Sequence, residues 1–77
     1  MIAKTDLSEM AEGWPSRFVA REEIGTFTGG ILKPKTIANY DSVGKGISPR
    51  YKIGHKTVYR VSDIISWLEG RAQKVGT

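Results

Sequence analysis

The sequence predicts a small α+β domain in which two short helices are followed by a β-hairpin and a third helix. Three observations lead to this prediction. Apolar residues recur with helical spacing in three stretches, β-branched and aromatic residues flank a Gly-His pair, and glycines or prolines separate these stretches. The chain has 77 residues, which is enough for one domain around one small core.

The two ends of the chain are expected to lie outside that domain. Residues 1–16 are polar, lack periodicity and end in Trp14-Pro15, so we expect a flexible N-terminal tail. Trp14 is interpreted either as an aromatic residue packed on the domain edge or as an exposed contact for a partner. The domain itself is assigned to residues 17–72, and residues 73–77 are expected to be loose.

The first helix is expected over residues 20–28, after a short extended segment at residues 17–19. Two glutamates stand in its first turn, where carboxylates favour the positive end of the helix dipole. The consecutive glycines at positions 29 and 30 are typical of a helix C-terminus. The inward face is formed by Ile24, Phe27 and Thr28.

The second helix is expected over residues 34–43. Pro34 suits the first helical position, where its missing N–H costs nothing, and Gly44 ends the helix. Because successive residues are rotated by about 100°, the helix has an apolar side and a donor-rich side. Ile37 and Tyr40 form the apolar side. The donor-rich side is formed by Lys35, Asn39 and Ser42, with Thr36 on its flank.

The β-hairpin is expected over residues 51–60, after a loop at residues 44–50. Its strands are Tyr51–Ile53 and Lys56–Arg60, joined by Gly54-His55 with glycine at the first position, as a type II′ turn prefers.

The third helix is expected over residues 63–72. Ser62 is a suitable N-cap, and Asp63 suits the first helical turn. The helix carries the strongest apolar cluster of the chain, so it is predicted to anchor the core. That cluster consists of Ile64, Ile65, Trp67 and Leu68.

The positive charge is concentrated in one segment. Residues 33–60 contain seven lysines and arginines against the single acid Asp41, a net charge of +6, whereas residues 1–16 carry −2 and the whole chain +4. A concentrated basic segment favours a polyanionic partner. The alternative is a basic surface that only keeps the protein in solution.

Several other function classes are disfavoured. The chain has no cysteine, no apolar run near the ~18 residues of a membrane span, and no apolar signal segment, so a cytoplasmic protein without a membrane partner is expected. The single histidine, His55, is too few for a metal site, and no cofactor or small-molecule substrate is expected. Residues 44–46 (GKG) lack the spacing of a phosphate-binding loop, and no nucleophile–base pair is evident, so no enzymatic activity is expected.

Two helices joined by a glycine turn and followed by a basic hairpin are typical of a winged helix-turn-helix. In that arrangement the second helix enters the major groove of DNA. Asn39 can pair with adenine, Lys35 can reach guanine or a phosphate, and the two hydroxyls can bind a phosphate or a base edge. Asp41 lies roughly 120° from Lys35 around the helix. It is therefore expected to lie off the DNA face, toward the third helix or solvent, and to pair with a lysine or arginine.

The stretch from Phe18 to Arg71 resembles the small excisionase-like winged-helix proteins of phages and prophages, which belong with the MerR-type DNA-binding domains. The matching pieces are VAREEIG, PKTIANYDS, GKGISPRYKIG and VYRVSDIISWLEGR. The sequence departs from the pattern at Lys33, where serine is common, and at Asp41, where a basic or neutral residue is frequent.

The resemblance implies a non-enzymatic protein that binds double-stranded DNA. It implies an architectural factor that directs an integrase toward prophage excision, or alternatively a transcriptional regulator of a phage or prophage. The candidate DNA contacts are Lys33, Lys35, Thr36, Asn39, Ser42, Lys45, Arg50, Lys52, His55, Lys56 and Arg60. His55 is interpreted either as an exposed turn residue or as a contact at the tip of the wing.

The resemblance also bears on partners and location. It implies double-stranded DNA, an integrase or recombinase, and cooperative self-association on DNA as partners, in the bacterial nucleoid. A second alternative, drawn from charge alone, is a protein-interaction adaptor that docks an acidic partner without binding DNA.

Overall fold

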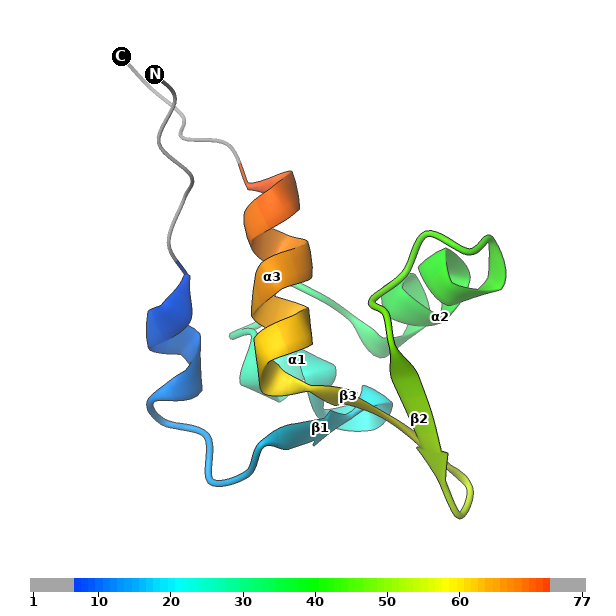
Figure 1. Ribbon diagram of the computed structural model, residues 1–77, viewed down its shortest axis with the longest axis horizontal. Coiled ribbons are helices and arrows are strands. Elements are labelled where there is room, and N and C mark those ends of the chain that lie inside the picture. Colours follow the sequence, from blue (N-terminus) through cyan, green and yellow to red (C-terminus); the bar gives the residue numbers. More distant parts are fainter. Residues whose placement is uncertain (1–6, 73–77) are drawn as a thin grey trace.

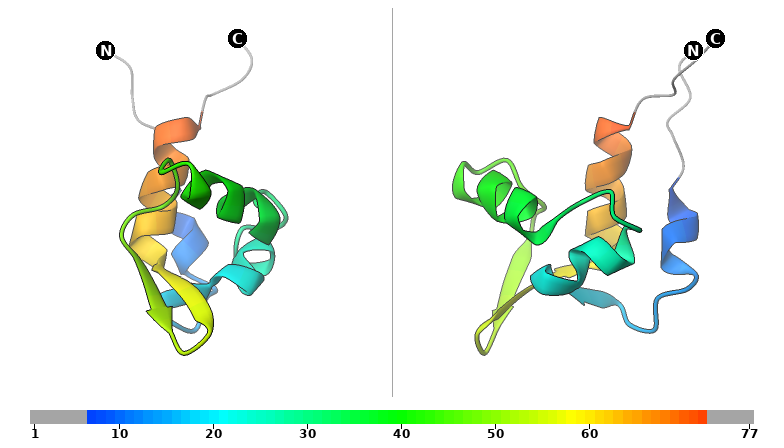
Figure 2. Two further views of the ribbon diagram at one scale, coloured as in Figure 1. Left: turned by 90° about the vertical axis from the view of Figure 1, so that its right-hand side faces the viewer. Right: turned by 180° about the vertical axis from the view of Figure 1, so that it is seen from behind.

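Helix α3 (Val61–Arg71) runs between an N-terminal segment on one side and helix α2 (Pro34–Ser42) on the other, as Figures 1 and 2 show. This computed structural model describes residues 7–72, which form an α+β fold. The remaining elements are the 3₁₀ helices η1 (Ser8–Ala11) and η2 (Arg21–Glu23), helix α1 (Ile24–Phe27), and strands β1 (Phe18–Ala20), β2 (Arg50–Ile53) and β3 (Lys56–Arg60). The predicted loose C-terminus at residues 73–77 lies outside the described residues.

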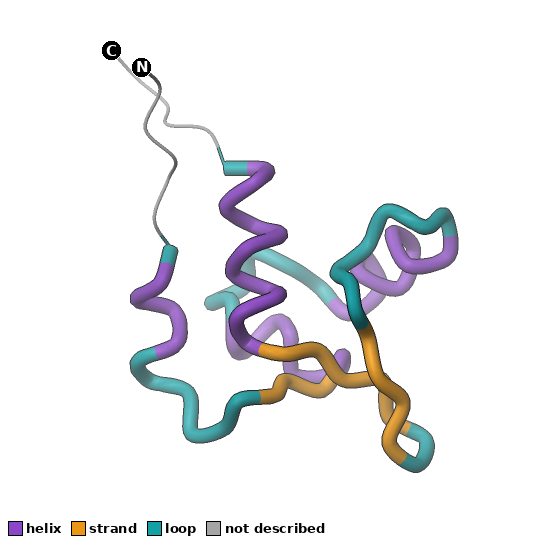
Figure 3. Tube along the Cα trace, in the orientation of Figure 1, coloured by secondary structure: helices purple, strands orange, loops and turns teal. Residues whose placement is uncertain are grey.

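The three strands form one antiparallel sheet in the order β1-β3-β2 (Figure 3). Val19 pairs with Tyr59, and both are completely buried, so β1 closes the core against β3. The sequence predicted residues 17–19 as extended but not their pairing with the hairpin, because strand partners distant in the chain leave no local pattern. The opposite face of the sheet carries a T-shaped contact between Phe18 and Tyr51, with ring centroids 6.2 Å apart.

The core is formed by apolar residues from every element except η1, η2 and β2. It consists of Val19, Ile24, Phe27, Leu32, Ile37, Ile47, Tyr59, Val61, Ile64, Ile65 and Leu68. The predicted inward faces of the first and third helices are confirmed, although Trp67 is only half-buried. The glycines that end the first helix, Gly29 and Gly30, have φ of +66° and +90°, a region open mainly to glycine.

The first helix differs from its prediction over residues 20–28. Ala20 belongs to β1, residues 21–23 form η2, and only Ile24–Phe27 is α-helical. The pairing of β1 with β3 holds Ala20 extended, with ψ of 146°, so the helix cannot begin there. Gly25 in its interior lowers the helical preference further, by about 1 kcal/mol relative to alanine.

The start of the third helix also differs. Helix α3 begins at Val61, so Ser62 lies inside its first turn and is not the N-cap. The Val61 N–H donates to the carbonyl of Arg17 at 2.8 Å, so a backbone group supplied by tertiary structure satisfies the first helical donor.

The N-terminal segment departs from the predicted tail over residues 7–16, whereas residues 1–6 lie outside the described part. The Leu7 N–H donates to Oε2 of Glu69 at 2.8 Å, and Met10 and Trp14 pack against the core. The Trp14 ring meets Phe27 edge to face at 5.2 Å, which confirms the interpretation of Trp14 as an edge-packing aromatic. Residues 7–16 therefore belong to the folded unit.

The second helix and the hairpin match their predictions closely. Helix α2 ends at Ser42, and Gly44 has φ of +74° just beyond it. Strands β2 and β3 are joined by Gly54-His55, with φ of +62° at Gly54 and a negative φ at His55, as a type II′ turn requires. Within residues 7–72, no helix combines the length and apolar character that crossing a membrane would need.

Candidate nucleic-acid interface

Helix α2 presents its predicted donor-rich side to solvent. Lys35, Thr36, Asn39 and Ser42 are all exposed, while Ile37 on the opposite side is completely buried. The Ser42 hydroxyl donates to the carbonyl of Asn39 at 2.7 Å, so its proton is engaged and its oxygen remains available as an acceptor. The Asn39 amide has no intramolecular partner among the described residues, which leaves its donor and acceptor free for a ligand.

An exposed valine that the sequence reasoning did not select lies next to this side. Val43 is 65% exposed at the C-terminal end of α2. It follows Thr36 by seven residues and Asn39 by four, so the three side chains lie along one stripe of the helix. The helical projection identifies it, although a valine offers no hydrogen-bond donor. An exposed aliphatic side chain there suits contact with a thymine methyl group.

Asp41 holds the other side of α2 to the rest of the fold. Its Oδ2 accepts hydrogen bonds from the Arg21 guanidinium at 2.7 Å and from the Tyr59 hydroxyl at 2.5 Å. The Asp41 side chain is only 5% exposed. The expected position off the donor-rich side and the expected pairing with a basic residue are therefore confirmed. The expected direction, toward the third helix or solvent, is wrong, because Asp41 faces η2 and β3.

The same network shifts two acid–base equilibria. Burial raises the pKa of Tyr59 to about 12, and the hydrogen bond to Asp41 adds to the rise while Arg21 opposes it. The hydrogen bond to Tyr59 is the largest influence that raises the pKa of Arg21. The protonated Tyr59 hydroxyl and the Arg21–Asp41 ion pair therefore join η2, α2 and β3.

Gly46 lies directly against the Asp41 carboxyl group. A Cβ built on Gly46 would collide with Oδ1 of Asp41 and would stand 2.9 Å from its Cγ, closer than real Cβ atoms approach. The loop after α2 can fold over this carboxylate only because position 46 has no side chain. The sequence indicated a loop here but carried no signal that this glycine packs against an acid.

An aromatic cluster joins α2 to α3. Tyr40 meets Trp67 edge to face at 5.2 Å, and the Arg71 guanidinium lies over both rings, 4.5 and 4.2 Å from their centroids. The Trp67 indole N–H donates to the carbonyl of Lys45 at 3.1 Å, so the loop after α2 is held by the same cluster. Helix α2 is thus anchored on two sides, by Asp41 and by Tyr40.

The hairpin presents most of its basic residues to solvent. Arg50, Lys52 and His55 are exposed, and Lys56 is exposed but forms an ion pair with Glu22 of η2. The hydrogen bond to Glu22 raises the pKa of Lys56, which stays charged. Arg60 lies at the base of the hairpin, where Arg50 pairs with Tyr59, and its guanidinium lies 5.6 Å from the centroid of the Tyr51 ring.

The tip of the hairpin and the start of α2 meet at a shallow cleft. The cleft has a volume of about 210 Å³ and is lined by Arg21, Glu22, Pro34, His55, Lys56 and Thr57. The first residue of α2 and the hairpin tip therefore lie side by side, whereas none of the predicted contacts on α2 lines the cleft. Glu22 places a carboxylate at this cleft, whereas its position in the sequence predicted only an interaction with the helix dipole.

All eleven predicted contacts are exposed, but they fall into separate groups. His55 and Lys56 line the cleft at the hairpin tip, and the predicted contacts on α2 lie outside it. Lys45 lies on the loop beside Trp67, and Arg50 and Arg60 lie at the hairpin base. Lys33 precedes α2 with extended backbone and makes no side-chain cap, as its departure from serine implied. In residues 7–72, no three His, Cys, Asp or Glu side chains are grouped as metal ligands.

Comparison with known proteins identifies no relative. No protein-family model, no curated protein and no solved structure matches this chain.

Proposed function

We propose that this chain is a small winged-helix protein that binds double-stranded DNA. Helix α2 would lie in the major groove, and the hairpin would contact the backbone or an adjacent minor groove. The contacts would be those predicted on α2 and on the hairpin tip, with Val43 added on the stripe of α2 that carries Asn39.

The burial of Asp41 is the observation that carries this proposal. Asp41 is the only acid within residues 33–60, and it is covered and neutralised by Arg21. The seven lysines and arginines of that segment are all exposed, so its surface presents cations without any carboxylate of its own. A surface of this kind is attracted to the phosphate backbone of DNA.

The Glu22–Lys56 ion pair tempers the attraction at the hairpin tip. The Glu22 carboxylate at the cleft repels phosphate, and in the free protein Lys56 already forms an ion pair with it. Lys52, which has no acidic partner among the described residues, is therefore the stronger candidate for a phosphate contact on the wing.

A gel-shift selection from random duplex DNA, followed by affinity measurements on the selected site, tests the proposal. Asn39→Ala is expected to weaken the selected site by ~1–3 kcal/mol and to leave non-specific binding almost unchanged. The matched control is Ser66→Ala, which removes an exposed polar group from α3. If Asn39→Ala leaves the sequence preference intact, readout by α2 is refuted.

The salt dependence tests the electrostatic part separately. Each phosphate contact contributes about 0.9 to the slope of log K against log salt. Lys52→Ala should therefore flatten the slope by roughly one unit on every sequence. If the wild-type protein does not bind duplex DNA at physiological salt, the proposal fails. That result would favour the alternative of a protein-interaction adaptor.

The resemblance to excisionase-like proteins supports a more specific role, an architectural factor that assists an integrase in prophage excision. Such a factor bends its site and occupies neighbouring sites together. Circularly permuted DNA fragments carrying the selected site measure the bend. Binding to a single site without bending would favour a transcriptional regulator instead.

A further inference from the structure

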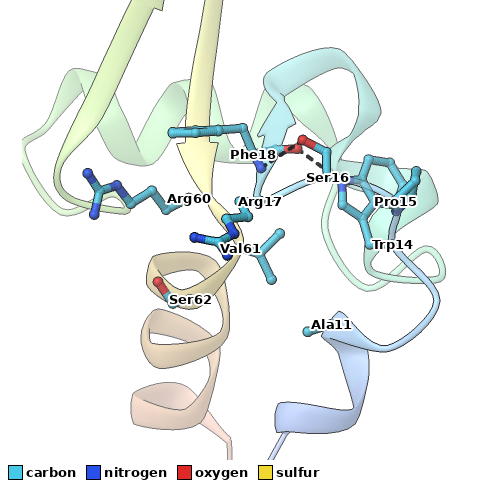
Figure 4. A pocket seen from close by; sticks show the side chains of 9 residues that line it. All are labelled: Ala11, Trp14, Pro15, Ser16, Arg17, Phe18, Arg60, Val61 and Ser62. Atoms are coloured by element: carbon cyan, nitrogen blue, oxygen red, sulfur yellow. Dashed lines mark hydrogen bonds between the residues drawn. The ribbon is translucent and has the colours of Figure 1, made fainter.

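A cavity of about 710 Å³ lies beside the junction of β3 with α3, and Figure 4 shows the side chains that line it. Its walls are the loop after η1, the start of β1 and the junction of β3 with α3, and no residue of α2 or of the hairpin turn lines it. This volume falls within the ~300–1,000 Å³ typical of ligand and peptide-anchoring pockets. Of the eleven candidate DNA contacts only Arg60 lines this cavity, and the contacts proposed on α2 and on the hairpin tip lie outside it.

The lining combines an apolar part with two cations. Trp14, Pro15 and Phe18 supply apolar surface, and Arg17 and Arg60 supply the charge. Among the nine described residues that line the cavity, none is acidic, and neither arginine forms an ion pair within residues 7–72. Two unpaired guanidinium groups beside an apolar wall are complementary to a segment carrying both carboxylates and an apolar side chain.

At Phe18, the free edge of β1 cannot pair with another strand. The N–H of Phe18 donates to the Ser16 hydroxyl at 3.1 Å, and its carbonyl accepts the Trp14 indole N–H at 3.0 Å. These side chains occupy both backbone groups of Phe18 at the free edge of β1. A partner at this position must therefore bind through its side chains.

A nucleic acid suits this cavity less well than a protein segment does. A phosphodiester backbone would use the two arginines but would leave the exposed apolar wall unused. An acidic peptide with an aromatic or aliphatic residue would use both. We propose that this cavity docks an acidic segment of a partner protein, with its carboxylates at Arg17 and Arg60 and its apolar side chain against Trp14 and Phe18.

A random-peptide library displayed on phage and selected against the full-length chain provides the probe. The selected peptides are expected to combine aspartate or glutamate with an aromatic or aliphatic residue. Arg17→Gln and Arg60→Gln should each weaken the best peptide by about tenfold, as for arginines at the centre of an interface. The control Arg50→Gln removes an exposed arginine outside the cavity and should leave the affinity unchanged.

The two tryptophans provide a readout of the binding position. In ¹H–¹⁵N spectra the Trp14 indole signal should shift on peptide addition, while that of Trp67, held by the Lys45 carbonyl, should not. The proposal is overturned if no acidic sequence is selected, if the amide version of the best peptide binds equally well, or if only Trp67 responds. It is also overturned if duplex DNA displaces the peptide, because a nucleic acid would then be the occupant.

The outcome is independent of the proposed DNA binding. Asn39→Ala should leave peptide binding intact, and Arg17→Gln should leave the sequence preference for DNA intact. Failure of one proposal therefore leaves the other standing.

Discussion

Replacing Asp41 by asparagine removes one charge from the network that holds α2 to η2 and β3. The carboxylate accepts two hydrogen bonds, one from Arg21 and one from Tyr59. Hydrogen bonds to a charged group contribute about 1.5–3 kcal/mol each and those between neutral groups about 0.5–1.5. The Tyr59 hydrogen bond therefore weakens by roughly 1 kcal/mol, and loss of the partly exposed ion pair with Arg21 costs about 1 kcal/mol more, or about 2 kcal/mol in total.

Two features of the site keep the expected loss near that value. The Arg21 side chain is 31% exposed and can turn toward water when its partner is lost, which limits the penalty of an unpaired charge. Tyr59 is completely buried, so its hydroxyl cannot replace the lost hydrogen bond with one to water. For a domain whose total stability is about 5–15 kcal/mol, a loss near 2 kcal/mol is substantial and should lower Tm by roughly 8–16 °C.

Urea unfolding followed by tryptophan fluorescence measures this loss through the linear extrapolation. The matched control is Glu12→Gln, which removes the same charge at an exposed position. A double-mutant cycle with Tyr59→Phe should show coupling of ~1 kcal/mol or more. If Asp41→Asn stays within ~0.5 kcal/mol of wild type, or if the coupling is near zero, the network does not anchor α2.

Three further predictions concern single positions. Gly46→Ala should destabilise the fold by ~2 kcal/mol or more in urea unfolding, because the new methyl group would collide with Asp41. The control Gly70→Ala adds a methyl group in open space inside α3 and should stabilise the fold by up to ~1 kcal/mol. Equal effects would contradict the close packing of Gly46 on Asp41. Burial raises the pKa of Tyr59 from 10.0 to about 12, so the stability that the neutral hydroxyl contributes is complete below pH 10 and is lost between pH 10 and 12. The difference in unfolding free energy between wild type and Tyr59→Phe should therefore shrink by about 2–3 kcal/mol across that window. A constant difference would contradict this. Glu22→Gln should free Lys56 and steepen the salt dependence of DNA binding by roughly one unit; an unchanged slope would show that Lys56 does not contact phosphate.

Helix α2 shows how much of this protein could be predicted from local sequence. The first-position proline, the terminating glycine and the spacing of Ile37 and Tyr40 determined its ends and its faces, because these signals act within one or two helical turns. The hairpin turn was predictable for the same reason, since glycine at its first position supplies a positive φ. The exposure of all eleven candidate contacts follows from the same local patterns.

The joints between elements could not be predicted in this way. The Arg21–Asp41–Tyr59 network, the pairing of β1 with β3, and the packing of Trp14 on Phe27 join residues far apart in the chain. Such contacts depend on where several elements meet, and no spacing within one element encodes them. The sequence by itself therefore determined the second helix, the hairpin and the donor-rich side of α2. Only the tertiary structure decided where the single acid of that segment points, because its direction depends on the arginine and the tyrosine that surround it.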